Sequence, residues 1–331
     1  MARPPRILLP HTVVMITSRV QQGLPFTCTP LMELLLWSAL TVAYNHHPIR
    51  IIAFVVMGNH IHLIALVEDP VQVESFMERF KCETAHAVNR LLGRRQVTVW
   101  CEGYDSPTIL TLEDLLEKLA YLYTNPVKAC RTDSIQHYCG VSSWSMFSTG
   151  QSTRNAKRIR RTFIDPMPLG RLTPRQHEQF AAIVEEQATE SLAFVLDPHA
   201  WMKAFPSHMT ADDFDAKIMK RIKEVEADLE RSRRRSRISL PSQAEVLNQP
   251  MDMAYAPKKF GKRMWCICSN IPLRVAFIHF IKDLRARAKE VKHRWLNGGW
   301  MEPFPPGLFP PCLPTLANII PSYIQRCLAA V

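Results

Sequence analysis

The sequence predicts an α+β domain, built on one largely antiparallel sheet with helices on one face, followed by a mainly helical, basic extension. Three observations lead to this prediction. Up to about residue 150, segments rich in β-branched residues alternate with segments whose apolar residues recur at helical spacing. Gly58-Asn59 separates two adjacent strand-like segments, which favours a tight antiparallel hairpin. Beyond residue 150, long charged helical patterns dominate.

The sequence pattern of the first 150 residues predicts the element order β-α-β-β-α-β-α. Thr29-Pro30 is a typical helix start, and Thr111 with Asp114 three residues later forms a capping-box pattern. Pro126 is expected to end the last of these helices. Strands are expected over 11–20, 49–57 and 60–67, short strands and turns over 96–110, and helices over 31–44, 71–92 and 112–123.

The second half predicts a basic linker over 151–172 and a mainly helical extension over 173–331 that contacts DNA. Within the extension we expect helices over 173–195, 211–237 and 272–295, a loop over 241–257, a strand over 260–270 and an irregular proline-rich segment over 304–314. The helix over 211–237 ends in RSRRRSR, which holds more positive charge than the helix dipole explains. This run favours DNA-backbone contacts by Arg231, Arg233, Arg234, Arg235 and Arg237.

Composition limits the class of protein. Apolar residues make up 47% of the 331 residues, which suffices for a core and excludes disorder throughout. The net charge of +11 suits a polyanionic partner, with nucleic acid before a membrane surface. No leader peptide and no membrane-spanning run is visible. Cys266-Ile267-Cys268 lacks the second cysteine pair that a zinc site needs, so we interpret it as a strand with two buried thiols. The cysteines are otherwise scattered along the chain, which favours a reducing cytoplasm.

Two pairs of residues have spacings that suit chemistry. His60 and His62 lie on one face of a strand, where two imidazoles can hold a divalent metal; the alternative is two histidines on a sheet surface. Tyr121 and Asn125 share one helix face, and the alternative is a packing tyrosine with a capping asparagine. Tyr123 lies about 160° away around the helix and cannot share that site.

An ordered set of motifs then resembles a known family. The set comprises GNHIHLI at 58–64, Phe80-Lys81 with Asn89, VWCEGY at 99–104, YLYTNPVKA at 121–129 and SSWSMF at 142–147. Together they resemble the IS200-like single-tyrosine HUH transposases, in the group associated with repetitive extragenic palindromes. The resemblance spans about residues 8–150 and implies a ferredoxin- or RRM-like HUH endonuclease fold. Gly58 replaces the usual proline, and 101–104 is an imperfect W-x-x-R-[FY] motif.

The resemblance implies a nucleophile, Tyr121, and a metal site of His60, His62 and Asn125 that takes Mg²⁺ or Mn²⁺. The expected enzyme cleaves and rejoins single-stranded hairpin or palindromic DNA through a 5′-phosphotyrosine, without a small-molecule substrate. It acts as a monomer in preference to a dimer and is associated with the nucleoid.

Supporting residues and rival functions stay open. Arg19, Lys81 and Lys128 are candidate phosphate contacts or solvated charges, and Trp100 and Tyr104 either stack on bases or belong to the core. One rival function is a catalytically inactive, nucleic-acid-binding domesticated transposase. The other is a metal-dependent hydrolase in which the tyrosine is structural.

Overall fold

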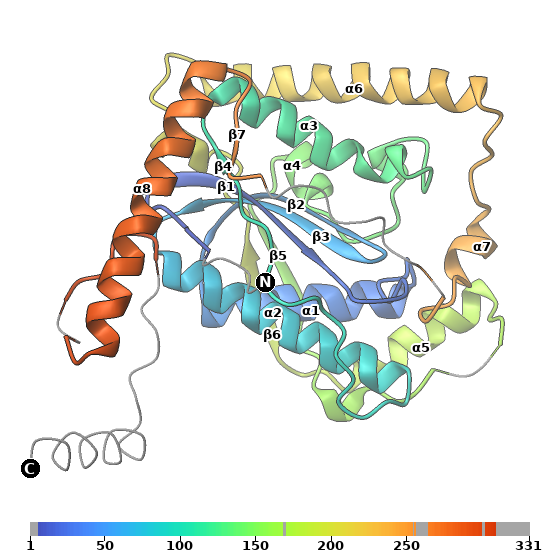
Figure 1. The fold of residues 1–331 in the computed structure, drawn as a ribbon. Coiled ribbons are helices and arrows are strands. Elements are labelled where there is room, and N and C mark those ends of the chain that lie inside the picture. Colours follow the sequence, from blue (N-terminus) through green and yellow to red (C-terminus); the bar gives the residue numbers. More distant parts are fainter. Residues whose placement is uncertain (1–5, 168–169, 254, 256–263, 300–301, 309–331) are drawn as a thin grey trace, which may run out of the picture.

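A mainly antiparallel five-stranded sheet forms the centre of the computed structural model, which describes residues 6–167, 170–253, 255, 264–299 and 302–308 (Figure 1). The strand order is β2-β3-β1-β4-β7. The strands are β1 Thr12–Arg19, β2 Arg50–Met57, β3 His60–Val67, β4 Thr108–Ile109 and β7 Cys266–Ile267. Every neighbouring pair is antiparallel except β4 with β7, which is parallel. The predicted α+β class with a mainly antiparallel sheet is confirmed.

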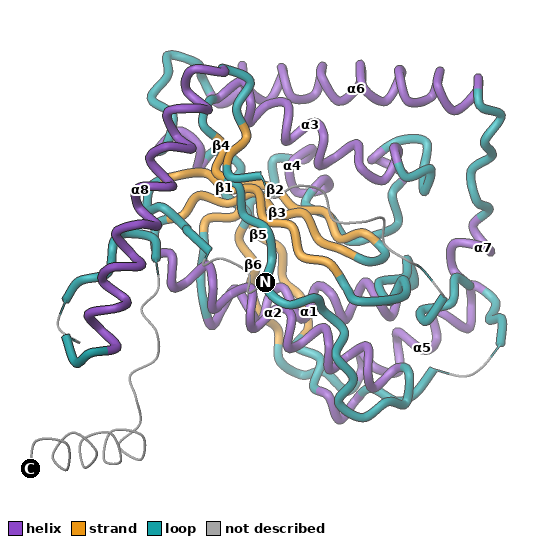
Figure 2. Tube along the Cα trace, in the orientation of Figure 1, coloured by secondary structure: helices purple, strands orange, loops and turns teal. Residues whose placement is uncertain are grey.

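Helices cover both faces of this sheet, whereas the sequence predicted helices on one face (Figure 2). Helices α1 Pro30–His46 and α2 Pro70–Leu91 pack on one face. Helices α3 Leu112–Lys128 and α6 Ala211–Arg235 belong to the core on the other. The physical reason lies in β2 and β3, in which nearly every side chain is buried. Strands that are apolar on both faces need cover on both sides.

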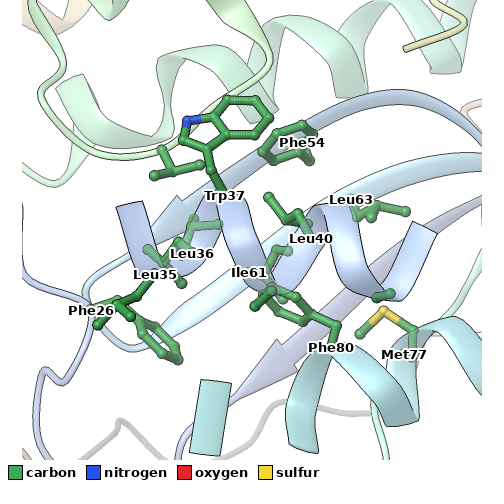
Figure 3. Packing of buried hydrophobic residues seen from close by; sticks show 14 of the residues in the cluster. Phe26, Leu35, Leu36, Trp37, Leu40, Phe54, Ile61, Leu63, Met77 and Phe80 are labelled. Carbon is green, nitrogen blue, oxygen red and sulfur yellow. The ribbon is translucent and has the colours of Figure 1, made fainter. Parts of the chain in front are cut away.

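The core beneath the first face is a close-packed cluster of aromatic and aliphatic side chains. Figure 3 shows Trp37 and Leu40 of α1, Phe80 of α2 and the strand residues Phe54 and Leu63 gathered in this layer. The Trp37 ring meets Phe54 edge-on, with 5.6 Å between centroids. Thr29 caps α1 by accepting a hydrogen bond from the Met32 amide, as its sequence position predicts.

Helix α3 extends beyond its predicted end because Pro126 lies inside it. Proline removes one backbone hydrogen bond, but the Ala129 amide bonds to the Asn125 carbonyl and the Arg131 amide to the Pro126 carbonyl. These bonds carry the last turn through Lys128. Asn125 is therefore a helical residue and not the cap, so it keeps the spacing that places it on the same face as Tyr121.

The predicted basic linker contains a strand. β5 Thr153–Lys157 pairs antiparallel with β6 Ser191–Val195, and α5 Pro174–Glu186 lies between them in sequence. The single helix predicted over 173–195 is therefore wrong beyond Glu186. Phe194 of β6 is fully buried, with its ring 5.7 Å from those of both Trp37 and Phe54. The chain thus rejoins the first core directly after residue 150; whether residues 1–150 form a separate folding unit stays a prediction.

The remaining elements are short apart from one long helix. α4 Trp144–Thr149 follows α3, and single turns of 3-10 helix lie at Ile135–His137, Arg161–Phe163 and Ala200–Lys203. α7 Gln243–Leu247 interrupts the predicted loop, and α8 Ile271–Leu296 agrees with its prediction. Cys266 and Cys268 are buried, as predicted. Parts of the expected strand over 260–270 and of the segment over 304–314 lie outside the described residues. None of the helices described is long and apolar enough to cross a membrane.

The core on the α3 and α6 face contains side chains from the C-terminal half, so we expect this half to stabilise the sheet. Phe214 of α6 is almost fully buried against Trp201, with 4.5 Å between ring centroids. We expect Phe214→Ala to lower the free energy of unfolding by about 3–5 kcal/mol, because it removes a ring from a closed core. Urea denaturation measures this. Met202→Ala, at a side chain that is 47% exposed, is the control; equal losses in the two variants would contradict the packing.

Candidate active site

The two histidines lie side by side on the inner strand β3, on the face that α3 covers. Their ring centroids are 4.7 Å apart. On the neighbouring strand β1, Arg19 is the register partner of His60 and Thr17 that of His62. His62 is buried and His60 is partly exposed. The strand spacing predicted from the sequence therefore brings both imidazoles to one place.

Both imidazoles are neutral at physiological pH. Burial and, to a lesser degree, the positive charge of Arg19 lower the pKa of His60 to about 4. Burial lowers the pKa of His62 well below its usual value, and the nearby His60, Arg19 and Lys118 lower it further. Only the neutral form of imidazole has a lone pair for a metal, so this environment favours the form that binds one.

The second nitrogen of each ring has a partner that orients it. The Nδ1 of His60 lies 2.7 Å from the Asn59 amide oxygen, which can only accept, so Nδ1 donates and Nε2 keeps its lone pair. The Nδ1 of His62 lies 2.9 Å from the Thr17 hydroxyl. A hydrogen bond at one ring nitrogen that leaves the other for a metal is typical of metal-binding histidines. Thr17 and Asn59 are supporting residues that the sequence analysis did not single out.

Tyr121 of α3 faces this pair. Its ring lies edge-on to His62, with 5.7 Å between centroids, and its side chain is half-buried. Tyr123, by contrast, is in the core: its hydroxyl lies 3.0 Å from the Ser143 hydroxyl, and burial raises its pKa. The two tyrosines thus point to opposite environments, as their helical spacing predicted, and only Tyr121 lies beside the histidines.

Asn125 lies one helical turn beyond Tyr121 on α3. Its side chain is buried, and its amide nitrogen has no hydrogen-bond partner within the described part of the chain. The amide oxygen is the atom of this side chain that could bind a cation, because the amide nitrogen only donates hydrogen bonds. No group of three or more His, Cys, Asp or Glu that could hold a metal occurs among the described residues. A cation here would be bound by two imidazoles and this amide.

Two lysines flank the Tyr121 ring. The Lys118 ammonium lies 5.3 Å from the ring centroid and that of Lys128 lies 5.6 Å away. Lys128 was expected from the sequence, and Lys118 was missed, although it precedes Tyr121 by one helical turn and so shares its face. Arg19 is exposed next to His60 on β1. The surroundings of the tyrosine and the histidines are thus strongly positive.

Other candidate residues lie in different surroundings. The Lys81 ammonium donates to the carbonyls of Cys101 and Gly103, at 2.9 and 3.0 Å, and so supports that loop. Trp100 is buried and its indole donates to the Thr84 hydroxyl. Tyr104 is also buried, with the Arg6 guanidinium 3.4 Å above its ring. Trp100 and Tyr104 therefore belong to the core and do not offer a stacking surface.

The basic end of α6 is largely exposed. Arg231 pairs with Asp228 and Arg234 with Glu230, each one helical turn earlier. These ion pairs offset part of the local positive charge but leave the side chains at the surface. Of the arginines predicted to contact DNA, Arg231, Arg234, Arg235 and Arg237 are exposed and Arg233 is partly buried. Arg237 lies two residues beyond the end of α6.

The fold and this site define an α+β domain whose strand carries a neutral histidine pair facing a helical tyrosine. Residues 11–116 match the family model described as "Transposase IS200 like". This segment, roughly a third of the chain, is similar to the IS200-like transposases. It includes both histidines and Lys81, and it ends shortly before Tyr121.

One solved structure is also similar. It is described as a REP-associated tyrosine transposase bound to a REP hairpin and is 20% identical to this chain. The similarity covers 45% of this chain and 86% of that one, with a TM-score of 0.39. No curated protein matched the chain.

The low histidine pKa predicts that acid destabilises the metal-free fold. His60 has a pKa of about 4 when folded and about 6.5 when unfolded, so below pH 6.5 only the unfolded chain takes up this proton. Its contribution to stability is therefore lost as the pH falls from 6.5 towards 4, by about 1.4 kcal/mol per pH unit. Urea denaturation with EDTA at pH 7, 6 and 5 measures this. The slope of the free energy of unfolding against pH should flatten in His60→Ala but not in His137→Ala, at an exposed histidine. Equal slopes in the unmodified protein and both variants would contradict this prediction.

Proposed function

We propose that this protein is a metal-dependent transposase that cleaves and rejoins single-stranded hairpin DNA, with Tyr121 as the nucleophile. The observation that carries the proposal is the position of the Tyr121 ring, 5.7 Å from His62 and on the face that also holds His60. The family of residues 11–116 supports a DNA-transposing activity. The nucleophile and its neighbours come from one chain, which favours a monomer.

We assign His60, His62 and Asn125 to the metal site, which takes Mg²⁺ or Mn²⁺. Two neutral imidazoles with oriented rings offer lone pairs to such a cation, and nitrogen ligands favour Mn²⁺. Asn125 would add its amide oxygen. When bound, the cation would offset the negative charge on the scissile phosphate.

The reaction exchanges one phosphodiester for another. The Tyr121 oxygen loses its proton and bonds to phosphorus, the bond from phosphorus to the 3′ oxygen breaks, and the departing strand takes a proton to end in a 3′-hydroxyl. The 5′ end stays linked to Tyr121 as a phosphotyrosine. Because the new ester conserves the bond energy, a 3′-hydroxyl of another strand can reverse the step and join DNA.

Positive side chains hold the DNA around this centre. We assign Lys118, Lys128 and Arg19 to the phosphates next to the tyrosine, because the two lysines lie within 6 Å of the Tyr121 ring and Arg19 lies next to His60. We assign the arginine-rich end of α6 to the DNA backbone further away. Lys81 acts through the loop that it supports and not through a phosphate. A DNA substrate fits a nucleoid-associated protein of the cytoplasm.

The proposal is tested by trapping the covalent intermediate. A labelled single-stranded hairpin with flanking single strands is incubated with the full chain and Mn²⁺, denatured and separated by size. We expect a labelled protein band, and mass spectrometry should map the nucleotide to Tyr121. DNA binding without any adduct would indicate the inactive binding protein, and cleavage without an adduct would indicate a metal-dependent hydrolase.

Lys118 gives a smaller, separate effect. Its ammonium stabilises negative charge on the Tyr121 oxygen and on the phosphate, so we expect Lys118→Gln to slow adduct formation about 10-fold, equivalent to about 1.4 kcal/mol. The loss should shrink at higher pH, where the phenol ionises without help. Lys220→Gln, an exposed lysine on α6, is the control. Equal rates in the two variants at every pH would contradict this role.

A further inference from the structure

A cavity of about 680 Å³ lies between the start of α1 and the segments around α5 and α7. Its lining mixes apolar side chains with hydrogen-bonding and basic groups, including Leu31, Met251, His177, Gln249, Arg94 and Arg171. Its volume is in the range of sites for small ligands. Most of the polar lining comes from residues after 166, outside the stretch that matches the transposase family.

His177 of α5 lines this cavity without a partner. The residue is only 4% exposed, and neither ring nitrogen has a hydrogen bond within the residues that the structure describes. A neutral imidazole has one donor and one acceptor, and burying both without partners costs free energy. Buried polar groups are otherwise nearly always satisfied, so this histidine is poised for a ligand that supplies an acceptor and a donor.

Gln249 supplies a second unused group. Its amide nitrogen is buried and makes no hydrogen bond to any described residue. The neighbouring Asn248 is fully used: its amide oxygen accepts from the Leu172 amide at 2.8 Å, and its amide nitrogen donates to the Leu172 carbonyl at 3.0 Å. Asn248 thus fixes this wall of the cavity and holds the adjacent Gln249 in place.

The cavity lies next to the Gly58-Asn59 turn, which directly precedes His60. The Gln249 amide nitrogen is 3.8 Å from the position that a Cβ at Gly58 would occupy. The Leu24 amide bonds to the Met251 carbonyl, and the Phe26 amide to the Gly58 carbonyl. Gly58 precedes His60 by two residues. The Gly58-Asn59 turn thus links the wall of the cavity to the strand that carries His60 and His62.

We propose that this cavity receives one unstacked nucleobase of the DNA strand held at the Tyr121 site and reads its identity. The inference rests on the proposed function. A base is flat with apolar faces, which suit Leu31 and Met251, and its edge offers the acceptors and donors that His177 and Gln249 lack. Arg171, which is exposed, and Arg94, which pairs with Asp252 at 3.6 Å, supply positive charge for the adjoining phosphates.

The test uses binding, so that it does not depend on cleavage. A hairpin DNA with randomised single strands on both sides is selected on the full chain carrying Tyr121→Phe, and the bound pool is sequenced. We expect a strong preference at one flanking position. His177→Leu in the same background should reduce that preference about 10-fold or more, because hydrogen-bonded bases contribute this much discrimination, and leave the other positions unchanged. Gln249→Leu should also reduce the base preference at this position.

Two further measurements separate the outcomes. His208→Leu, at an exposed histidine, should select the same sequences as the parent. A selected hairpin is then compared with the same hairpin carrying an abasic site at the preferred position. The parent should bind the abasic hairpin more weakly than the intact one, whereas the His177→Leu protein should bind the two equally well. The melting temperature of His177→Leu should not fall, because the ring makes no hydrogen bond to a described residue and leucine keeps an apolar group in its place.

A pool without preference at any position, or one that His177→Leu does not change, would overturn the inference. A large drop in the melting temperature of His177→Leu would make the histidine structural and overturn it too. Failure of the proposed function is seen elsewhere, as the absence of an adduct with the unmodified chain.

Discussion

Replacing Tyr121 with phenylalanine is expected to reduce covalent adduct formation at least ~10³-fold, to the limit of detection, because it removes the oxygen that we propose as the nucleophile. The ring is retained, so its edge-on contact with His62 and the two lysines beside it have the same partner as before. The fold and DNA binding should therefore be unchanged. Quantifying the protein-linked label from a single-turnover incubation with Mn²⁺ measures the effect.

Tyr123→Phe is the matched control, two residues along the same helix. It removes the hydroxyl that lies 3.0 Å from the Ser143 hydroxyl in the core, which should cost about 1 kcal/mol of stability and leave adduct formation intact. The opposite pattern, with the adduct lost in Tyr123→Phe and retained in Tyr121→Phe, would reassign the nucleophile. Cleavage retained in both variants, without an adduct, would make water the nucleophile and both tyrosines structural.

The hairpin that carries the histidines could be predicted because its determinants are local. β3 has the predicted bounds, His60–Val67, and the two-residue turn Gly58-Asn59 joins it to β2. Alternation along a strand depends only on backbone geometry, so the common face of His60 and His62 followed directly. The same holds for Tyr121 and Asn125 once α3 continues through Pro126.

Features that depend on distant segments could not be predicted. β6 looked like the end of a helix, and only its pairing with β5 and the burial of Phe194 against Trp37 and Phe54 explain it as a strand. β7 joins the sheet beside β4 through two residues, Cys266–Ile267, more than 150 positions later in the chain. Short apolar segments have no period that separates strand from helix, so tertiary contacts decide.

The supporting residues of the site also divide into those that local spacing predicts and those that depend on distant segments. Lys118 is one helical turn from Tyr121 and was detectable from the spacing alone. Thr17 could not be found, because its contact with His62 requires the register between β1 and β3. Lys81 matched a family motif, but its hydrogen bonds to Cys101 and Gly103 appear only when the loop is folded against α2.

Replacing His60 and His62 together with alanine is expected to weaken Mn²⁺ binding by at least ~10²-fold and to lower adduct formation by a similar factor. The pair supplies both nitrogen ligands of the proposed site, and Asn125 alone cannot hold a cation in competition with water. Isothermal titration with Mn²⁺ and the adduct assay at increasing Mn²⁺ measure the two losses. EDTA should reduce the unmodified protein to the same level as the variant.

Because His62 is buried, the double substitution also leaves a cavity in the β3 face, so folding must be followed separately. Asn125→Ala removes the amide oxygen proposed as the third ligand, so it should raise the Mn²⁺ concentration needed for half-maximal rate by about 10-fold. The loss of stability should be small, because the amide nitrogen makes no hydrogen bond to a described residue. His137→Ala, at an exposed histidine paired with Asp133, should change neither property. Adduct formation that persists in EDTA, or Mn²⁺ binding that survives the loss of both imidazoles, would mean that the pair orients Tyr121 and does not bind metal.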